Sequence, residues 1–116
     1  MILKVDPFQY SSLRELADRA EKKAKAMEAA NSAAARIAAR PLFIALDGVT
    51  DPQNLGAVIR SAAAFGANGV ILPERRSASV NAAAWKVSAG AAAHMPVARV
   101  VNLTKAIEGL KERGYY

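Results

Sequence analysis

Two short, unbroken apolar runs constrain the fold of this chain most strongly. Residues 42–46 read LFIAL and residues 70–72 read VIL, with no polar side chain in either run. A strand with one face in water alternates apolar and polar residues, so unbroken runs are typical of strands covered on both faces. We therefore expect two buried strands, the second ended by Pro73, and a third strand over residues 97–101.

Segments with helical signals separate these strands. A helix is expected from about residue 54 to residue 65, where Gly66 is the kind of residue that commonly ends a helix. The Ala-rich region after the second strand should be helical up to residues 94–96, and a last helix should begin after its cap, Asn102. The order β-α-β-α-β-α, closed by right-handed crossovers, predicts an α/β fold with a parallel sheet and helices on both faces.

An Ala-rich helix is expected ahead of the sheet. Ser12 and Glu15 have the spacing of a capping box, which opens a helix by satisfying free backbone N–H groups. The helix could run towards Ala39, in one piece or in two, because residues 31–32 (NS) interrupt the pattern. Its basic cluster, residues 22–25, is interpreted as a solvated helix face rather than a phosphate contact.

The sheet domain should be incomplete. A parallel sheet must be covered and its edges managed, yet only three strong strands occur in this sequence. The chain stops at Tyr116, shortly after a helix, where a further strand ought to start. We therefore interpret residues 1–40 as a linker with an N-terminal helix, and residues 41–116 as the first part of a domain.

Composition limits the classes of function. The chain has no cysteine and one histidine, so disulfides, thiolate catalysis and a metal cluster are not expected. No apolar run approaches the roughly 18 residues that a membrane span needs, which predicts a soluble, cytoplasmic protein. Sixteen basic and ten acidic residues give a net charge of +6. A basic balance of this size favours a polyanionic partner such as nucleic acid.

One arginine stands out on the helix expected after the first strand. Arg60 lies away from the face that should pack on the sheet, and its neighbours one turn away, Gly56 and Ala63, are small. Small neighbours allow a second surface to come close, whether RNA, a ligand or another subunit, and a guanidinium there would suit bidentate contact with a phosphate. A solvent-facing arginine fits the pattern equally well. The expected sheet-facing side chains are those of Leu55, Val58, Ile59, Ala62 and Phe65.

Three segments resemble a known family. Residues 47–66 read DGVTDPQNLGAVIRSAAAFG, residues 70–73 read VILP, and residues 86–91 read KVSAGA. In order and spacing they resemble the SpoU (TrmH-like) RNA ribose 2′-O-methyltransferases, with residues 47–66 matching the first motif of that family. The resemblance covers roughly residues 41–116.

The resemblance implies a SPOUT-type α/β domain, whose chain is threaded into a deep trefoil knot and which binds S-adenosylmethionine as a homodimer. The implied substrate is a ribose 2′-hydroxyl in rRNA or tRNA. The motif arginine of the family, which helps to deprotonate that hydroxyl, falls on Arg60, and the motif asparagine falls on Asn54. Because a guanidinium is a poor base, orienting a phosphate or stabilising the developing alkoxide is the safer physical role for Arg60.

The motifs that form the knot and most of the methyl-donor pocket should follow Tyr116, and they are absent from this sequence. Cofactor-binding residues are therefore expected beyond that position. We expect the chain alone to bind S-adenosylmethionine poorly and to transfer no methyl group.

Other residues have two interpretations each. Arg75 and Arg76, in the loop after the second strand, and Lys86 could hold RNA phosphates, or they could be solvated side chains. Asn54 could cap its helix instead of supporting an active site. Asp47 and Asp51 fit turn and capping positions better than a metal site, because a third ligand is missing. Trp85 could stack on a base, although packing is the commoner use, and His94 fits the end of a helix.

A second class of function stays open beside the methyltransferase. The chain could be a non-catalytic RNA-binding or dimerising α/β module that keeps only the first motif. A general nucleotide-binding half-domain is less favoured, because the sequence contains neither G-x-G-x-x-G nor a P-loop.

Overall fold

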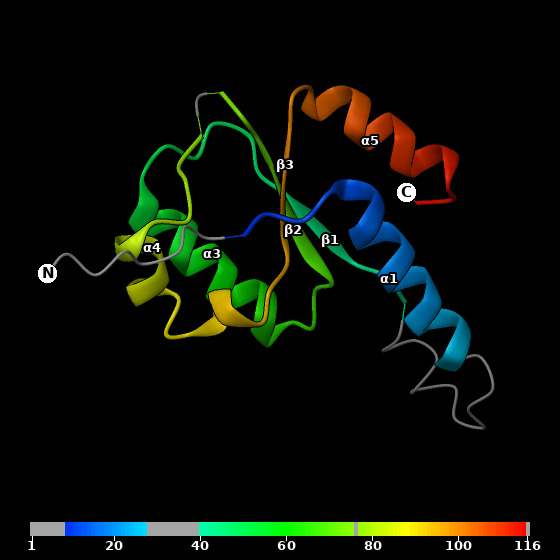
Figure 1. Cartoon of the computed structure of the whole chain (residues 1–116), viewed down its shortest axis with the longest axis horizontal. Helices are drawn as coiled ribbons and strands as arrows, with labels where there is room; N and C mark the ends of the chain where they lie inside the picture. Colours follow the sequence, from blue (N-terminus) through cyan, green and yellow to red (C-terminus); the bar gives the residue numbers. More distant parts are fainter. Residues whose placement is uncertain (1–8, 28–39, 76, 116) are drawn as a thin grey trace, which may run out of the picture.

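The computed structural model describes residues 9–27, 40–75 and 77–115 of the chain. In this part of the protein, three parallel strands form one sheet in the order β1-β2-β3, and helices connect them (Figure 1). The predicted order of strands and helices is confirmed. The elements are α1 (Leu13–Met27), β1 (Phe43–Ala45), α3 (Pro52–Ala64), β2 (Gly69–Pro73), α4 (Ala82–Val87), the 3-10 helix η1 (Ala91–Ala93), β3 (Val97–Val100) and α5 (Leu103–Glu112).

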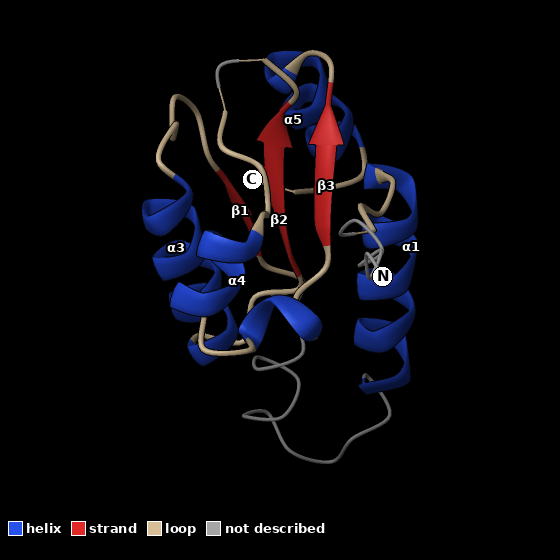
Figure 2. Cartoon of the chain, turned by 60° about the vertical axis from the view of Figure 1, so that its left-hand side comes forward, coloured by secondary structure: helices blue, strands red, loops and turns tan. Residues whose placement is uncertain are grey.

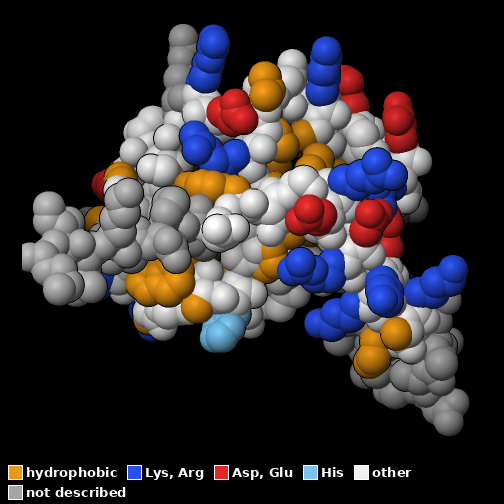
Figure 3. All heavy atoms as spheres, viewed as in Figure 1, with side chains coloured by type: hydrophobic (Ala, Val, Ile, Leu, Met, Phe, Trp, Pro, Cys, Tyr) orange, Lys and Arg blue, Asp and Glu red, His pale blue; other side chains and the backbone are white. Residues whose placement is uncertain are grey.

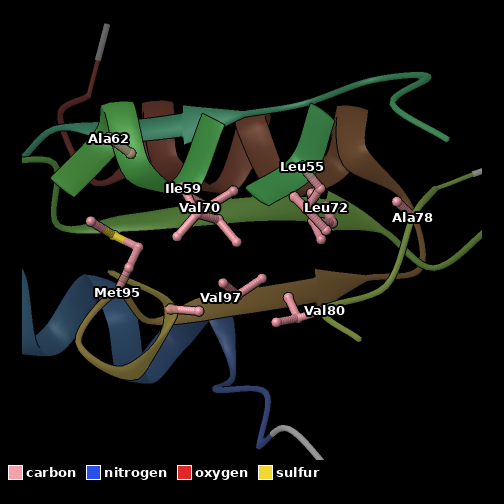
Figure 4. Close-up of a cluster of buried hydrophobic side chains, with 10 residues drawn as sticks. Leu55, Ile59, Ala62, Val70, Leu72, Ala78, Val80, Met95 and Val97 are labelled. Atoms are coloured by element: carbon pink, nitrogen blue, oxygen red, sulfur yellow. The ribbon is translucent and has the colours of Figure 1, made fainter. Parts of the chain in front are cut away.

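Helices cover both faces of the sheet, as predicted. Helices α3 and α4 lie on one side of the strands, with α1 and α5 on the other (Figures 1 and 2). The side chains of the middle strand alternate between the two layers: Val70 and Leu72 pack towards α3 and η1, whereas Ile71 packs towards α1 and α5. Figure 4 shows Leu55 and Ile59 of α3 directly above the strand residues of the larger cluster. Burial of β2 on both faces is therefore confirmed.

Strand β1 differs from the prediction. It is only three residues long, its first two side chains are half-buried, and Ala45 is exposed. Leu42, just before it, keeps 45% of its surface exposed. Within the described residues β1 pairs with β2 alone, so it is an edge strand. The expectation of a strand covered on both faces is wrong here, because neither layer of helices extends fully over this edge.

Helix α3 begins earlier than predicted. Asp51 is its N-cap, with a side-chain Oδ1 that accepts the backbone N–H of Gln53 at 2.9 Å, and Pro52 occupies the first turn. The capping role expected for Asp51 is confirmed, and the alternative in which Asn54 caps the helix is wrong. At the other end, Gly66 has φ +75° and turns the chain away.

Phe65 is a second departure, because it does not pack on the sheet. Its side chain is 82% exposed. The helix ends at Ala64, so the spacing that carries Leu55, Ile59 and Ala62 onto the sheet no longer governs residue 65.

The remaining helix boundaries follow polar caps. Ser12 Oγ accepts the N–H of Glu15 at 3.1 Å and opens α1, and Asn102 Oδ1 accepts the N–H of Lys105 at 3.0 Å and opens α5, both as predicted. The lysine side chains of residues 22–25 are exposed, which confirms a solvated face. The predicted continuation of α1 to Ala39 and its interruption at residues 31–32 lie outside the described residues.

The Ala-rich region after β2 consists of two pieces instead of one helix. Ala89 and Gly90 take positive φ values of 55° and 86° and separate α4 from η1. The buried Ser88 stabilises the break: its Oγ donates to the Trp85 carbonyl at 2.7 Å and accepts the Ala92 N–H at 3.3 Å. His94 caps η1 through its backbone N–H, which confirms its predicted place at a helix end.

Gly56 allows α3 and α4 to pack closely. A Cβ atom at this position would overlap the Ala84 carbonyl oxygen and lie 3.0 Å from the Val87 Cβ. Because the first obstacle is backbone, the helix itself must shift to make room for any side chain. The glycine is thus a packing requirement of the α3–α4 contact.

Replacing Gly56 by Ala should destabilise the fold by about 1–3 kcal/mol in urea unfolding, because overpacking exceeds the gain in helix propensity. Gly109→Ala is the matched control, since Gly109 lies inside α5 with nothing within 4 Å of an added Cβ. That control should stabilise by about 0.5–1 kcal/mol. Equal stability of Gly56→Ala and the parent chain would show that the two helices separate at no cost.

Candidate functional site

The carboxyl ends of the three strands meet at one edge of the sheet, where ligands bind in open parallel sheets. Three connections gather there: residues 46–51 after β1, residues 74–81 after β2, and residues 101–102 after β3. The first two are joined directly, since the Ala78 N–H donates to the Val49 carbonyl at 2.7 Å. Gly48 takes φ +78° in the first loop, a conformation that suits glycine.

Two of the predicted site residues lie at this edge. Asn54 is the third residue of α3 and its side chain is exposed. Arg75 is exposed in the loop after β2, whereas its neighbour Arg76 lies outside the described residues. Asp47, Asp51 and Glu74 are also exposed here. The described part of this edge is therefore of mixed charge and not uniformly positive.

Arg60 is further away. It is the ninth residue of α3, eight steps from Pro52. Eight steps amount to about 12 Å along the helix axis, directed away from the loops. The side chain is exposed, and the ion pairs among the described residues do not include it. The structure therefore presents Arg60 as a cation facing solvent, on the same helix as Asn54 but six residues beyond it.

The small residues beside Arg60 have a different purpose from the one expected. The surface that approaches Gly56 is α4 of the same chain, and not RNA, a ligand or another subunit. This prediction is wrong at Gly56 because helical spacing identifies a close approach without identifying the approaching partner. Ala63, on the other side of Arg60, is exposed, and Lys86 is exposed in the last turn of α4.

Sequence reasoning missed one set of contacts at the loop edge. The Val80 N–H donates to the Tyr10 hydroxyl oxygen at 2.9 Å, and the Arg99 guanidinium carbon lies 5.0 Å from the centroid of the Tyr10 ring. Tyr10 and Val80 are 70 positions apart. No local pattern connects positions so distant, and only the apolar aromatic character of Tyr10 hinted at a buried role.

A second missed interaction joins α1 to α5. Arg113, just after α5, donates from Nε to Glu21 Oε1 at 2.9 Å and also pairs with Asp18. The hydrogen bond from Arg113 lowers the pKa of Glu21 below its ordinary value of 4.5, and the same bond raises the pKa of Arg113. Both groups are near the surface, so the pair orients the two helices more than it stabilises them.

An open hollow of about 920 Å³ lies over β1, between α1 and α5. Its floor is apolar and includes Phe43 and Ile71, and the buried hydroxyl of Tyr115, at its edge, makes no hydrogen bond in the structure. Four basic side chains and one carboxylate line it: Lys25, Arg40, Lys111, Arg113 and Glu21. Figure 3 shows Lys and Arg side chains gathered over α1.

Comparison with known proteins identifies the family. The profile of the SpoU rRNA Methylase family matches residues 41–116, which include all three strands and the loop edge. The chain belongs to the SpoU rRNA methylase family. The predicted resemblance is confirmed, and so is the α/β architecture that it implied.

Individual relatives of this SpoU family chain are much longer. It is 62% identical over 73 residues to an uncharacterized tRNA/rRNA methyltransferase of Mycobacterium ulcerans, which covers 63% of this chain and 24% of the relative. It is 46% identical over 112 residues to an uncharacterized tRNA/rRNA methyltransferase of Synechocystis, covering 97% of this chain and 26% of the relative. The chain thus spans about a quarter of the length of these relatives.

Solved structures agree with the fold. The SpoU methyltransferase AviRb from Streptomyces viridochromogenes, in complex with S-adenosylmethionine, superposes with a TM-score of 0.56 at 31% identity, over 63% of this chain and 28% of that one. An rRNA methyltransferase from Sinorhizobium meliloti, also bound to S-adenosylmethionine, gives 0.54 at 28% identity, over 78% and 28% of the two chains.

Two further observations concern the described residues alone. Among them, no three His, Asp or Glu side chains come together as a metal ion would require. No helix in the described ranges has the length and apolar character needed to cross a membrane.

Proposed function

We propose that this SpoU family chain is the first part of the catalytic domain of an RNA ribose 2′-O-methyltransferase, which acts on rRNA or tRNA in the cytoplasm with S-adenosylmethionine as cofactor. Family membership over residues 41–116 is the observation that carries this proposal. The first motif, residues 47–66, forms the β1–α3 loop and helix beside the carboxyl edge of the sheet.

Arg60 is the proposed catalytic residue. A ribose hydroxyl becomes a good nucleophile as its proton leaves, and negative charge then builds on the oxygen. A guanidinium near that oxygen stabilises the charge, or orients the neighbouring phosphate, without itself accepting a proton. Its exposure on a packed helix and its absence from the ion pairs of the described residues support this role. Asn54 is proposed to support the same site from the loop edge.

The methyl donor supplies an electrophilic methyl group on a sulfonium, but the described residues do not form a fitting site for it. A donor of this size needs an enclosed pocket with a few buried polar groups. The buried polar side chain in the described residues is Ser88, and its hydroxyl is already bonded to Trp85 and Ala92. The unpartnered Tyr115 hydroxyl lies beside β1 on the α1–α5 face, not among the carboxyl-edge loops. We therefore propose that donor binding requires further segments, and that these segments also cover the hollow over β1.

A homodimer is part of the proposal. Arg60 and the loop edge are about 12 Å apart along α3, so one copy does not bring them together readily. A second copy of the chain can complete a site that uses both Arg60 and the loop edge. The exposed side chains of α3 and α4 around Arg60 support such a contact.

The alternative function is a non-catalytic RNA-binding or dimerising module. The uncovered β1 edge and the missing donor site favour it for the chain in isolation. The two functions predict different activities for a chimera with a longer relative: only the methyltransferase would make such a chimera transfer methyl groups.

A chimera in which this chain replaces the matching segment of the Synechocystis relative should methylate rRNA on ribose. Arg60→Ala in the chimera should lower the transfer rate about 100-fold, as loss of one oxyanion-stabilising donor does, and leave methyl-donor affinity unchanged. Transfer of labelled methyl groups and mass spectrometry of the nucleosides measure both properties. Arg19→Ala, an exposed arginine on α1, is the control. A full rate in Arg60→Ala, or a methylated base in place of ribose, would contradict the proposal.

The chain alone should not bind S-adenosylmethionine in the micromolar range, because its described loops do not form the enclosed pocket that the donor needs. Isothermal titration of the purified chain measures this directly, with the chimera as the positive control. Micromolar binding to the isolated chain would show that the described loops suffice for the donor.

The double change Arg75→Ala with Arg76→Ala should weaken binding of structured RNA. It should also reduce the slope of log affinity against log salt concentration by roughly one to two, because each phosphate contact that is lost no longer releases a counterion. A matched control removes two charges elsewhere, Lys22→Ala with Lys105→Ala, both exposed on the helices that cover the other face. Fluorescence anisotropy over a salt series gives both slopes. Equal salt slopes for the two double variants would show that Arg75 and Arg76 contribute only to the overall charge and make no specific phosphate contact.

A further inference from the structure

Residues 9–12 precede the part of the chain that the family profile matches, yet they lie along the sheet. The Ser11 N–H donates to the Val97 carbonyl at 2.9 Å, and Ser11 forms an isolated parallel bridge with Ala98. The segment therefore occupies the outer edge of β3. At this position the edge strand offers fewer unpaired backbone groups to other chains.

The same segment brings Tyr10 to the loop between β2 and α4. The Tyr10 hydroxyl oxygen accepts the Val80 N–H at 2.9 Å in a partly buried hydrogen bond. The Tyr10 ring packs against the larger core cluster, to which Ala78 and Val80 of this loop also belong. Because a buried N–H requires an acceptor, the end of the loop depends on a side chain from outside the sheet domain.

Arg99 connects Tyr10 to the start of the same loop. Its guanidinium carbon lies 5.0 Å from the centroid of the Tyr10 ring, within the range of a cation–π contact. One of its terminal nitrogens donates to the Glu74 carbonyl at 3.4 Å. Glu74 is also held by its own N–H, which donates to the Val100 carbonyl at 2.8 Å.

The loop is thus anchored at three points. Glu74 is tied to β3, Ala78 to the first loop through Val49, and Val80 to Tyr10. Arg75 projects from the short stretch between the first two anchors and is exposed. Fixing both ends of a short loop reduces the conformations that its side chains must give up on binding.

We infer that Tyr10 and Arg99 form a latch through which the segment before the sheet domain sets the conformation of loop 74–81. Tyr10 is a positioning residue for the RNA contact made by Arg75. This second statement rests on the proposed function, whereas the latch itself rests on the contacts alone. The segment that contains Tyr10 is then part of the binding apparatus.

Amide hydrogen exchange on the 116-residue chain tests the latch without RNA. Tyr10→Phe keeps the ring beneath Arg99 and removes the acceptor of Val80. Val80 should then exchange about fivefold faster, the factor expected for an ordinary hydrogen bond. The Val70 N–H, bonded to the Pro96 carbonyl in the sheet, should not change. Unchanged protection of Val80 would overturn the latch.

Tyr115→Phe is the matched control for this measurement. Tyr115 packs on the opposite face of the sheet, and its buried hydroxyl has no hydrogen-bond partner in the structure. Removal of that hydroxyl should leave Val80 exchange at the parent rate. If Tyr115→Phe accelerates Val80 as much as Tyr10→Phe does, the effect is a general loosening and the latch is refuted.

A double-mutant cycle tests the link to RNA, since a merely structural tyrosine would not couple to one arginine. Tyr10→Phe should weaken binding of structured RNA about threefold in the parent, an effect within the usual range of coupling energies, and have no effect in Arg75→Ala. Equal losses in both backgrounds would overturn the positioning role. If Arg75→Ala alone binds RNA as the parent does, the proposed RNA contact fails, and the exchange data still decide whether the latch exists.

Discussion

The burial of β2 between two layers of helices is the constraint on which the rest of the structure depends. Val70 and Leu72 pack on α3, and Ile71 packs on the opposite layer, so removal of either layer would expose the middle of the sheet. The neighbours of β2 are both parallel to it, and parallel neighbours require long crossover connections, which are helical here. The crossovers in turn bring three loops to one edge. The gathering of these loops at one edge therefore follows from the parallel topology around β2.

Helix starts and the buried strand β2 could be predicted from the sequence, because each depends on residues that are close neighbours in the chain. The helix starts at Ser12 and Asn102 follow from side chains that satisfy backbone groups three residues away. Strand β2 follows from its continuous hydrophobicity. The errors arose where a pattern was extended past the element that justified it. Phe65 continues the spacing of α3 after the helix has ended, and residues 42–46 are apolar although β1 is only partly covered.

The residues of the candidate site stay a prediction from the sequence, and their arrangement in space could not be predicted from it. The first motif predicts Asn54 and Arg60 as site residues, but no spacing rule reveals that only Asn54 lies beside the loops, six residues before Arg60 on the same helix. Helical spacing at Gly56 correctly required a close neighbour, and the tertiary fold supplied α4. Contacts between distant positions, such as Tyr10 with Val80 and Arg113 with Glu21, leave no local signal because each residue alone has an ordinary surface or core character.

The uncovered edge of β1 has a consequence for the behaviour of the chain in concentrated solution. In the described part of the chain no strand pairs with the outer edge of β1, which lies beside an apolar hollow. The same edge of another molecule can pair with it, so association is expected to rise with protein concentration. The basic side chains at the rim, Lys25, Arg40 and Lys111, oppose this because two copies would bring like charges together. Added salt screens that repulsion, so the colloidal stability of the chain should be greatest in buffers of low ionic strength.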